Sequence, residues 1–178
     1  ESYQLYNLIP SFVRLTDDLN NWYIRRGRRR YWRSGADPES AADKSAAYAT
    51  LYRVLVTLTR AMAPVMPFVT EWLWQRLVRD PGLAQGVESV HLTRFPEGNS
   101  ADIDAELEAH VAQVREIVAL GLSLRETHRI GVRRPLARLT VASSDPAVRQ
   151  AVERLRGDLE AELNVKSVEL VEDDSALV

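Results

Sequence analysis

The chain has 178 residues, of which 46% are hydrophobic and 27% charged, and its formal net charge is −2. This length and composition indicate a folded protein with one good core or two small ones. The absence of cysteine excludes disulfides and thiolate metal sites, and no apolar run approaches the roughly 20 residues that a membrane span requires.

The first predicted helix runs from about residue 11 to residue 32, with Pro10 in its first turn. Its apolar residues recur at helical spacings and form one stripe, which consists of Leu8, Phe12, Leu15, Leu19 and Trp22. On a helical wheel at about 100° per residue, Arg26, Arg30 and Arg33 continue the same side. We therefore expect the second half of this helix to extend beyond its own bundle and to meet another partner.

A second helix is predicted from Pro38 to about residue 61, with Asp37 as its N-cap. The residues expected on its core face are Tyr48, Leu51, Leu55 and Leu58.

A third helix is expected to start at Pro67, because Pro64 and Pro67 each remove a backbone donor and interrupt the preceding helix. Its large apolar residues are Phe68, Trp72 and Leu73. The turn at 80–82, Asp-Pro-Gly, ends it. Residues 87–95 alternate weakly and are expected to form an extended strap laid across the helices.

The fourth predicted helix covers about residues 102–128 and has the cleanest apolar stripe, formed by Ile103, Leu107, Val111, Val114 and Val118. Beyond it, alternation predicts strands at 136–141 and 165–171. Asp145-Pro146 opens a helix between them, and Gly157 is the expected break before a short final turn. A helical crossover makes the two strands candidates for parallel neighbours, packed on the fourth helix.

The predicted fold is therefore mainly α, a four-helix bundle followed by a small β-α-β unit. Residues 1–98 are expected to hold the first three helices and the strap. Residues 99–130 form the fourth, linking helix, and residues 131–178 form the α/β unit with an acidic tail.

The most informative stretch is residues 18–32, where five arginines stand among four aromatic residues in a chain that is acidic overall. Guanidinium groups bind phosphates in forked pairs and stack on flat rings, so this pattern suits RNA. It equally suits a polar interface between protein domains, and a solvated helix face is a third interpretation. For Trp22 and Trp32, packing in the core is the simplest alternative.

A second basic cluster surrounds the junction between the fourth helix and the first strand, and it consists of Arg125, Arg129, Arg133, Arg134 and Arg138. Two basic patches on two subdomains suit one extended polyanion. Catalytic interpretations are weak by comparison. The chain has no glycine-rich phosphate loop and no nucleophile in a recognisable setting, and its three histidines lie too far apart for a metal motif.

With these segments in order, the chain closely resembles the C-terminal part of isoleucyl-tRNA synthetases, particularly the eukaryote-like type. Residues 19–32 resemble that family's Asn-Trp-Tyr-hydrophobic-Arg helix, which continues into an Arg-Arg-aromatic run. Residues 63–71 resemble the Ala-Pro-x-x-Pro-Phe-x-x-Glu segment that valine and leucine enzymes share, and residues 89–92 resemble a Ser-Val-His-Leu strap. Residues 130–136 and 162–166 favour the isoleucine enzyme over the valine enzyme.

The resemblance implies a helical anticodon-binding domain followed by a small junction domain. Its partners are then tRNA(Ile) and the missing upstream catalytic domain of the same chain, with no membrane and no DNA, in the cytoplasm. In the full enzyme, isoleucine is activated with ATP and Mg²⁺. The sequences that bind ATP are absent from these residues, so we expect no cofactor and no catalysis from this part alone. Because the chain starts at Glu1, it is expected to be a piece of a longer protein.

The candidate tRNA-binding residues are Trp22, Arg25, Arg26, Arg28, Arg29, Arg30, Trp32, Arg133 and Arg134. Two alternatives stay open. The arginine helix could dock the bundle onto the catalytic domain, and the chain could be the equivalent domain of a valine or leucine enzyme.

Overall fold

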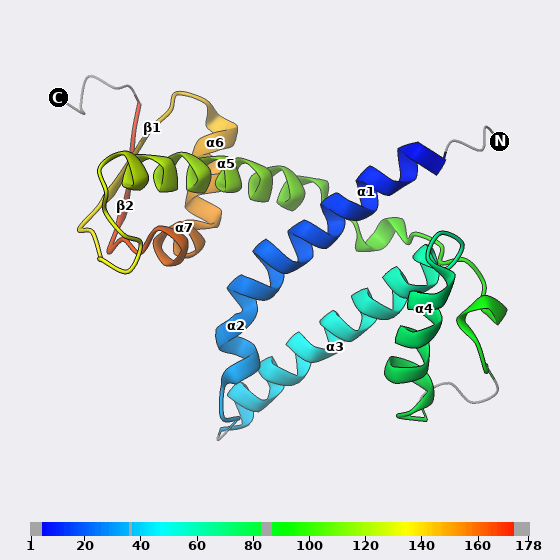
Figure 1. The fold of residues 1–178 in the computed structure, drawn as a ribbon. Coiled ribbons are helices and arrows are strands. Elements are labelled where there is room, and N and C mark those ends of the chain that lie inside the picture. The colour runs from blue at the N-terminus through cyan, green and yellow to red at the C-terminus, as the bar shows by residue number, and fades with distance from the viewer. Residues whose placement is uncertain (1–4, 36, 83–86, 173–178) are drawn as a thin grey trace. The chain divides into compact units, whose positions relative to one another are not determined.

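A computed structural model of the chain describes residues 5–35, 37–82 and 87–172. It is mainly helical with one small parallel sheet, which confirms the predicted mainly α class with a small α/β part (Figure 1). The chain divides into two compact units, residues 1–98 and residues 99–178. Within the described ranges, no helix is long and apolar enough to cross a membrane.

One continuous helical rod opens the first unit. It consists of α1 (Leu5–Asp18), a π-helical segment η1 (Leu19–Ile24) and α2 (Arg25–Trp32) (Figure 1). The predicted start near residue 11 was wrong, because the helix already includes Leu5 and Pro10 lies inside it. A proline in a helix removes one backbone hydrogen bond without ending the helix when the flanking turns hold.

The next two helices begin where the sequence places them. In α3 (Pro38–Met62), the carboxylate of the N-cap Asp37 accepts from Ser40 N at 2.8 Å. The helix α4 starts at Pro67, ends at Trp74 and continues as the π-helical segment η2 (Gln75–Arg79). The predicted N-cap and the predicted restart at a proline are both confirmed.

The residues that form the buried face of α4 and η2 are not the large apolar residues that the sequence analysis named on this helix. Thr70, Trp74 and Val78 recur every four residues and are each at most 5% exposed, whereas Phe68 is 89% exposed and Trp72 is 60% exposed. Trp74 and Val78 form the core of the first unit together with Ala63 and Val90. Side-chain size thus pointed to the solvent face, and only the spacing marks the packed one. The predicted core residue Tyr48 on α3 is likewise 51% exposed.

The strap after α4 contains a short 3₁₀ helix, η3 (Val90–Leu92), and no strand in its described part. The carboxylate of Glu71 on α4 fixes it, accepting from Ser89 Oγ at 2.8 Å and from Val90 N at 3.0 Å. Gln75 Nε2 donates to Glu71 Oε1 and to the carbonyl of Glu88, both at 2.7 Å. The strap is therefore tied to one face of α4 by a single network.

The second unit begins with a 3₁₀ turn, η4 (Ser100–Asp102), and the long helix α5 (Ala105–Thr127). It continues through β1 (Leu139–Ala142), α6 (Pro146–Arg154), α7 (Arg156–Leu163) and β2 (Val168–Val171). β1 and β2 pair in parallel, as predicted, with Leu139 opposite Val168. Gly157 was wrongly predicted as the break: it lies inside α7, and the chain turns at Leu155 between α6 and α7.

Packing in the second unit joins α5 to both shorter helices. Its buried apolar residues come from α5, α6, α7 and β2, and they are Val114, Val118, Ala151, Val152, Leu159, Leu163 and Val168. At Gly121 the helix α5 approaches α7 so closely that an added Cβ would lie 2.7 Å from Leu163 Cδ1. Gly121 is therefore required by a close approach of two helices.

We expect Gly121→Ala to lower the free energy of unfolding by about 1–3 kcal/mol, because the new methyl group overpacks against buried Leu163. Gly157→Ala is the matched control, since a Cβ there meets nothing within 4 Å. It should instead stabilise α7, by about 0.4–1 kcal/mol. Urea denaturation of both variants measures the two signs, and equal effects would contradict the close-approach interpretation.

Glu71→Gln should lower the free energy of unfolding at neutral pH by about 1–3 kcal/mol, because it removes a charged acceptor from three donors. Desolvation raises the pKa of Glu71, but the hydrogen bonds from Gln75, Ser89 and Val90 outweigh it and hold the pKa below 4.5. This stability is therefore present above pH 4.5 and disappears as the pH falls through the lowered pKa.

Urea denaturation from neutral to acidic pH tests this dependence, with the exposed Glu97→Gln as the control. The gap between wild type and Glu71→Gln should close in acid. A gap that stayed constant with pH would show that the charge of Glu71 does not hold the strap.

Candidate nucleic-acid interface

The arginine helix α2 carries one exposed basic face. Arg25, Arg28, Arg29 and Trp32 are all exposed, and their spacing of three, four and seven residues places them on the same side of an α-helix. Trp32 is 79% exposed, so its predicted alternative role in the core was wrong. This face, which we call the outer face of α2, combines three guanidinium groups with one accessible indole ring.

A second face of α2 is taken up by the bundle itself. Arg30 Nε donates to Oδ1 of Asp43 on α3 at 2.9 Å, and Arg30 Nη2 lies 2.8 Å from the same oxygen. Arg33 Nη1 lies 3.8 Å from the other carboxylate oxygen. The hydrogen bond from Arg30 lowers the pKa of Asp43, and Asp43 in turn raises the pKa of Arg30.

These ion pairs correct the prediction that the second half of the first helix leaves its own bundle. α2 packs against α3, and Arg30 and Arg33 find their carboxylate there. The wheel placed Arg30 and Arg33 on the packed side of the helix, and both do face α3. The wrong step was to infer from their charge that this side leaves the bundle, because a carboxylate of α3 pairs with them.

Aromatic rings support both faces of this helix. The guanidinium carbon of Arg26 lies 5.0 Å from the centroid of the Trp22 ring, within the range of a cation–π contact. Tyr31 meets Tyr48 of α3 edge to face, with ring centroids 5.2 Å apart and an angle of 71° between the planes. The pairing of Arg30 with Asp43 and that of Tyr31 with Tyr48 were not predicted from the sequence. The signal that could have found the ion pair is an arginine on the packed side of α2, next to a helix whose first turns carry the carboxylates Glu39 and Asp43.

The second basic cluster separates into buried and exposed members. Arg125 is only 5% exposed, whereas Arg129, Arg133 and Arg134 are exposed in the loop that joins α5 to β1. Arg138 Nη1 contacts both carboxylate oxygens of Glu169, at 3.0 and 2.9 Å. Three of the five arginines predicted in this cluster, Arg129, Arg133 and Arg134, are therefore exposed on one loop.

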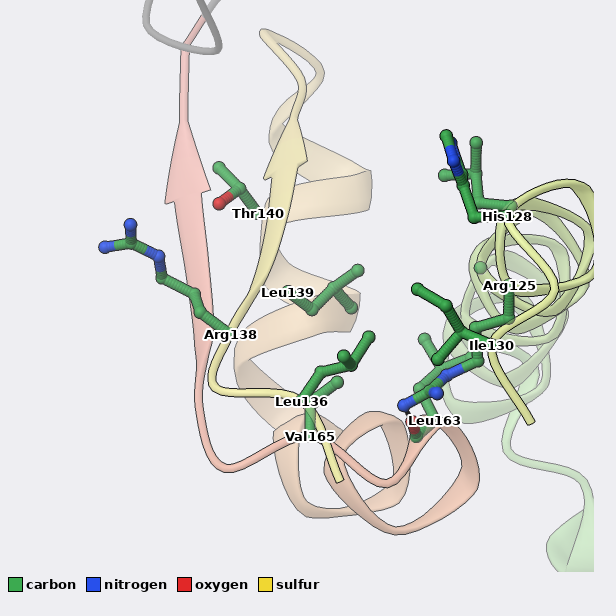
Figure 2. A pocket seen from close by; sticks show the side chains of 11 residues that line it. Arg125, His128, Ile130, Leu136, Arg138, Leu139, Thr140, Leu163 and Val165 are labelled. Atoms are coloured by element: carbon green, nitrogen blue, oxygen red, sulfur yellow. Dashed lines mark hydrogen bonds between the residues drawn. The ribbon is translucent and has the colours of Figure 1, made fainter. Parts of the chain in front are cut away.

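A groove of about 260 Å³ lies beside this loop, between the end of α5 and β1. Figure 2 shows Arg125 and His128 extending from α5, with Arg138 directed away on the far side of the strand. The lining is mainly apolar and includes Leu124, Ile130, Leu136, Leu139, Leu163 and Val165. The groove therefore lacks the convergent acid and base groups of an enzymatic centre.

The chemistry available in the described parts of the chain is electrostatic attraction and ring stacking. No group of three or more histidines, aspartates and glutamates there could hold a metal ion. Exposed arginines donate to phosphate oxygens in forked pairs, and an exposed indole offers a face on which a base can stack. The outer face of α2 and the loop at 129–134 are thus two candidate binding surfaces for a phosphate backbone.

Comparison with known proteins bears on both surfaces. A family model described as the anticodon-binding domain of tRNA ligase matches residues 1–141. An isoleucine–tRNA ligase of Chlamydia abortus is 41% identical over 167 residues, which cover 94% of this chain and 15% of the relative. One from Treponema denticola is 37% identical over 178 residues, all of this chain and 16% of the relative. The chain spans about one sixth of the length of these curated relatives.

The ion pair between α2 and α3 predicts a titration. In Arg30→Gln the pKa of the Asp43 carboxyl should rise toward its ordinary value of 3.8, because its main hydrogen-bond donor is removed. Arg28→Gln on the outer face is the control and should leave that pKa unchanged. Carboxyl chemical shifts followed by NMR measure both. If the two variants titrated alike, the pairing of Arg30 with Asp43 would not hold in solution.

Proposed function

We propose, because this chain belongs to the family of anticodon-binding domains of tRNA ligases, that it binds the anticodon arm of tRNA(Ile) within an isoleucine–tRNA ligase. The observation that carries this proposal is the outer face of α2, where three exposed arginines and exposed Trp32 share one side of a helix. Such a face fits a folded RNA strand better than a small ligand, because its charges are spread over two helical turns.

Each group on this face has a defined task in the proposal. Arg25, Arg28 and Arg29 pair with phosphates of the anticodon arm, and Trp32 stacks on an unpaired base of the loop. Arg30 stabilises the helix from its other side through Asp43. Binding by phosphate pairing releases counterions, so affinity should decrease steeply as the salt concentration increases.

Aminoacylation itself belongs to other segments of the proposed parent enzyme. There, ATP and Mg²⁺ activate isoleucine, and the aminoacyl group passes to the tRNA. The present chain supplies affinity and orientation for the tRNA, without a cofactor of its own. Its role in the reaction is to hold one end of the tRNA while the acceptor end is charged elsewhere.

A second candidate role is docking of α2 onto the catalytic domain of the same polypeptide. One observation favours it: Arg30 and Arg33 already use this helix to bind a protein carboxylate. The two roles make different demands on the outer face. RNA binding requires the arginines in the isolated chain, whereas docking requires them only in the complete enzyme.

The double charge reversal Arg28→Glu/Arg29→Glu separates these roles. We expect the affinity of the isolated chain for a tRNA(Ile) transcript to fall at least tenfold. The slope of log affinity against log salt should become shallower by about 0.7–0.9 for each phosphate that is no longer paired. Filter binding or fluorescence anisotropy at two or more salt concentrations measures both quantities.

The matched control is Arg76→Glu/Arg79→Glu, which makes the same change of net charge at exposed positions on η2. It should change affinity much less. Equal decreases in both variants would indicate a general charge effect, and unchanged tRNA binding with reduced aminoacylation by the full enzyme would support docking. Transcripts for valine and leucine, tested in parallel, decide whether the isoleucine assignment is correct.

A further inference from the structure

The loop between α5 and β1 has a defined backbone in spite of its exposed charges. Arg129 adopts a left-handed conformation with φ of 54°, and Arg134 N donates to the carbonyl of Gly131 at 3.0 Å. Ile130 N donates to the carbonyl of Arg125 at 2.8 Å, which closes the end of α5. These bonds fold the segment 129–134, which we call the basic loop, into consecutive tight turns.

The buried side chain of Arg125 ties the basic loop to the rest of the unit. Its Nη1 donates to the carbonyls of Gly131 at 3.3 Å and Arg134 at 3.1 Å, the two ends of one turn. Its Nη2 donates to the carbonyls of Leu163 at 2.6 Å and Asn164 at 3.3 Å, where α7 ends. Figure 2 shows Arg125 reaching from α5 to Leu163. One guanidinium group therefore connects three segments that are distant in sequence.

A second side chain reinforces this connection. Asn164 lies at the end of α7 in a left-handed conformation with φ of 48°, and its Nδ2 donates to the carbonyl of Val132 at 2.9 Å. The negative end of the α7 dipole and four carbonyl oxygens compensate the buried charge of Arg125. Because Arg125 is only 5% exposed and its guanidinium is occupied by backbone, it is not placed to bind a ligand itself.

The three arginines of the basic loop lie in a different environment. Arg129, Arg133 and Arg134 are exposed, and the described residues supply no carboxylate that pairs with them. Arg138, only four residues further along, is by contrast neutralised by Glu169. A short loop that presents three unneutralised cations on a fixed backbone fits a ligand with closely spaced negative charges.

We propose that Arg125 is a positioning residue that holds the basic loop in the shape needed to bind the phosphates of an RNA backbone. This inference rests on the proposed function, since it takes the RNA to be the tRNA bound by α2. Arg129, Arg133 and Arg134 pair with the phosphates. Arg125 acts through them, by removing the conformational freedom that an untied loop would lose on binding.

A double-mutant cycle on this chain tests the proposal. Arg125→Gln and Arg133→Gln/Arg134→Gln are compared singly and combined for binding a tRNA(Ile) transcript at several salt concentrations. We expect each change to weaken binding about fivefold to tenfold and to make the salt dependence shallower. Because Arg125 acts only through the loop, the combined variant should bind more tightly than the sum of the two separate effects predicts, and any decrease beyond the loop variant should come from Arg129 alone.

The salt dependence distinguishes positioning from a purely structural role. Arg125 is buried and cannot release counterions itself, so a shallower slope in Arg125→Gln must come from displaced loop arginines. Amide exchange at Arg134 N should accelerate in this variant while the core residues Val118 and Leu159 stay protected. Arg138→Gln is the control for charge in the same unit, and its affinity should stay within twofold of wild type.

Several results would overturn the inference. One is that the affinity losses of Arg125→Gln and of the loop variant add up in the combined variant. Another is that Arg125→Gln keeps the wild-type affinity and salt slope although its Arg134 amide exchanges faster. A third is that the loop variant binds tRNA normally and weakens only the contact with the rest of the ligase. If Arg125→Gln unfolds the second unit, Asn164→Gly replaces it, because glycine keeps the left-handed conformation and removes only the donor to Val132. In that variant, unchanged affinity and slope together with an accelerated Arg134 amide would likewise refute the positioning of the loop.

The failure of this inference is distinguishable from failure of the proposed function. If the loop variant Arg133→Gln/Arg134→Gln binds tRNA normally while Arg28→Glu/Arg29→Glu does not, the basic loop does not bind RNA and the role of α2 stands. If neither variant changes tRNA binding, the proposed function itself is wrong.

Discussion

The ion pair between the carboxylate of Asp43 and Arg30 is the interaction that orders the arginine helix against α3, beside the contact between Tyr31 and Tyr48. The carboxylate accepts a hydrogen bond from Arg30 and lies within ion-pair distance of Arg33, and thereby fixes the rotation of α2 against α3. With that rotation set, the residues on the opposite side of the helix necessarily face outward. One side of α2, with Arg30, therefore stabilises the fold, and the outer face of α2 is exposed to a ligand.

The same division recurs in the second unit by different means. The guanidinium of Arg125 donates to backbone carbonyls at the end of α7, whereas the guanidinium groups of the neighbouring loop arginines are exposed at the surface. The close approach of α5 and α7 at Gly121 brings Arg125 within reach of those carbonyls one turn later. In both units, one arginine that is bonded within the fold orders the segment that presents the exposed arginines. Sequence alone shows only that arginines cluster.

Local chemistry was predictable from the sequence, and long-range pairing was not. Asp37 caps α3 and β1 pairs with β2 in parallel, as expected, because both follow from residues adjacent in the chain or from the handedness of a crossover. The resemblance to isoleucyl-tRNA synthetases is confirmed by relatives that cover nearly the whole chain. The partner of Arg30 depends on the packing of α2 against α3, which no spacing rule encodes, and the spacing of the apolar residues gave no sign of the π-helical segment after Asp18.

The hydrogen bonds of Glu71 join two motifs that are separate in the sequence, the segment at 63–71 and the strap at 89–92. The glutamate closes the segment at 63–71, and the Ser-Val pair opens the strap at 89–92, yet the same carboxylate binds both residues of that pair. One carboxylate therefore couples the two segments physically. A lineage that replaced Glu71 would relax the constraint on Ser89, so these positions should change together among homologous chains.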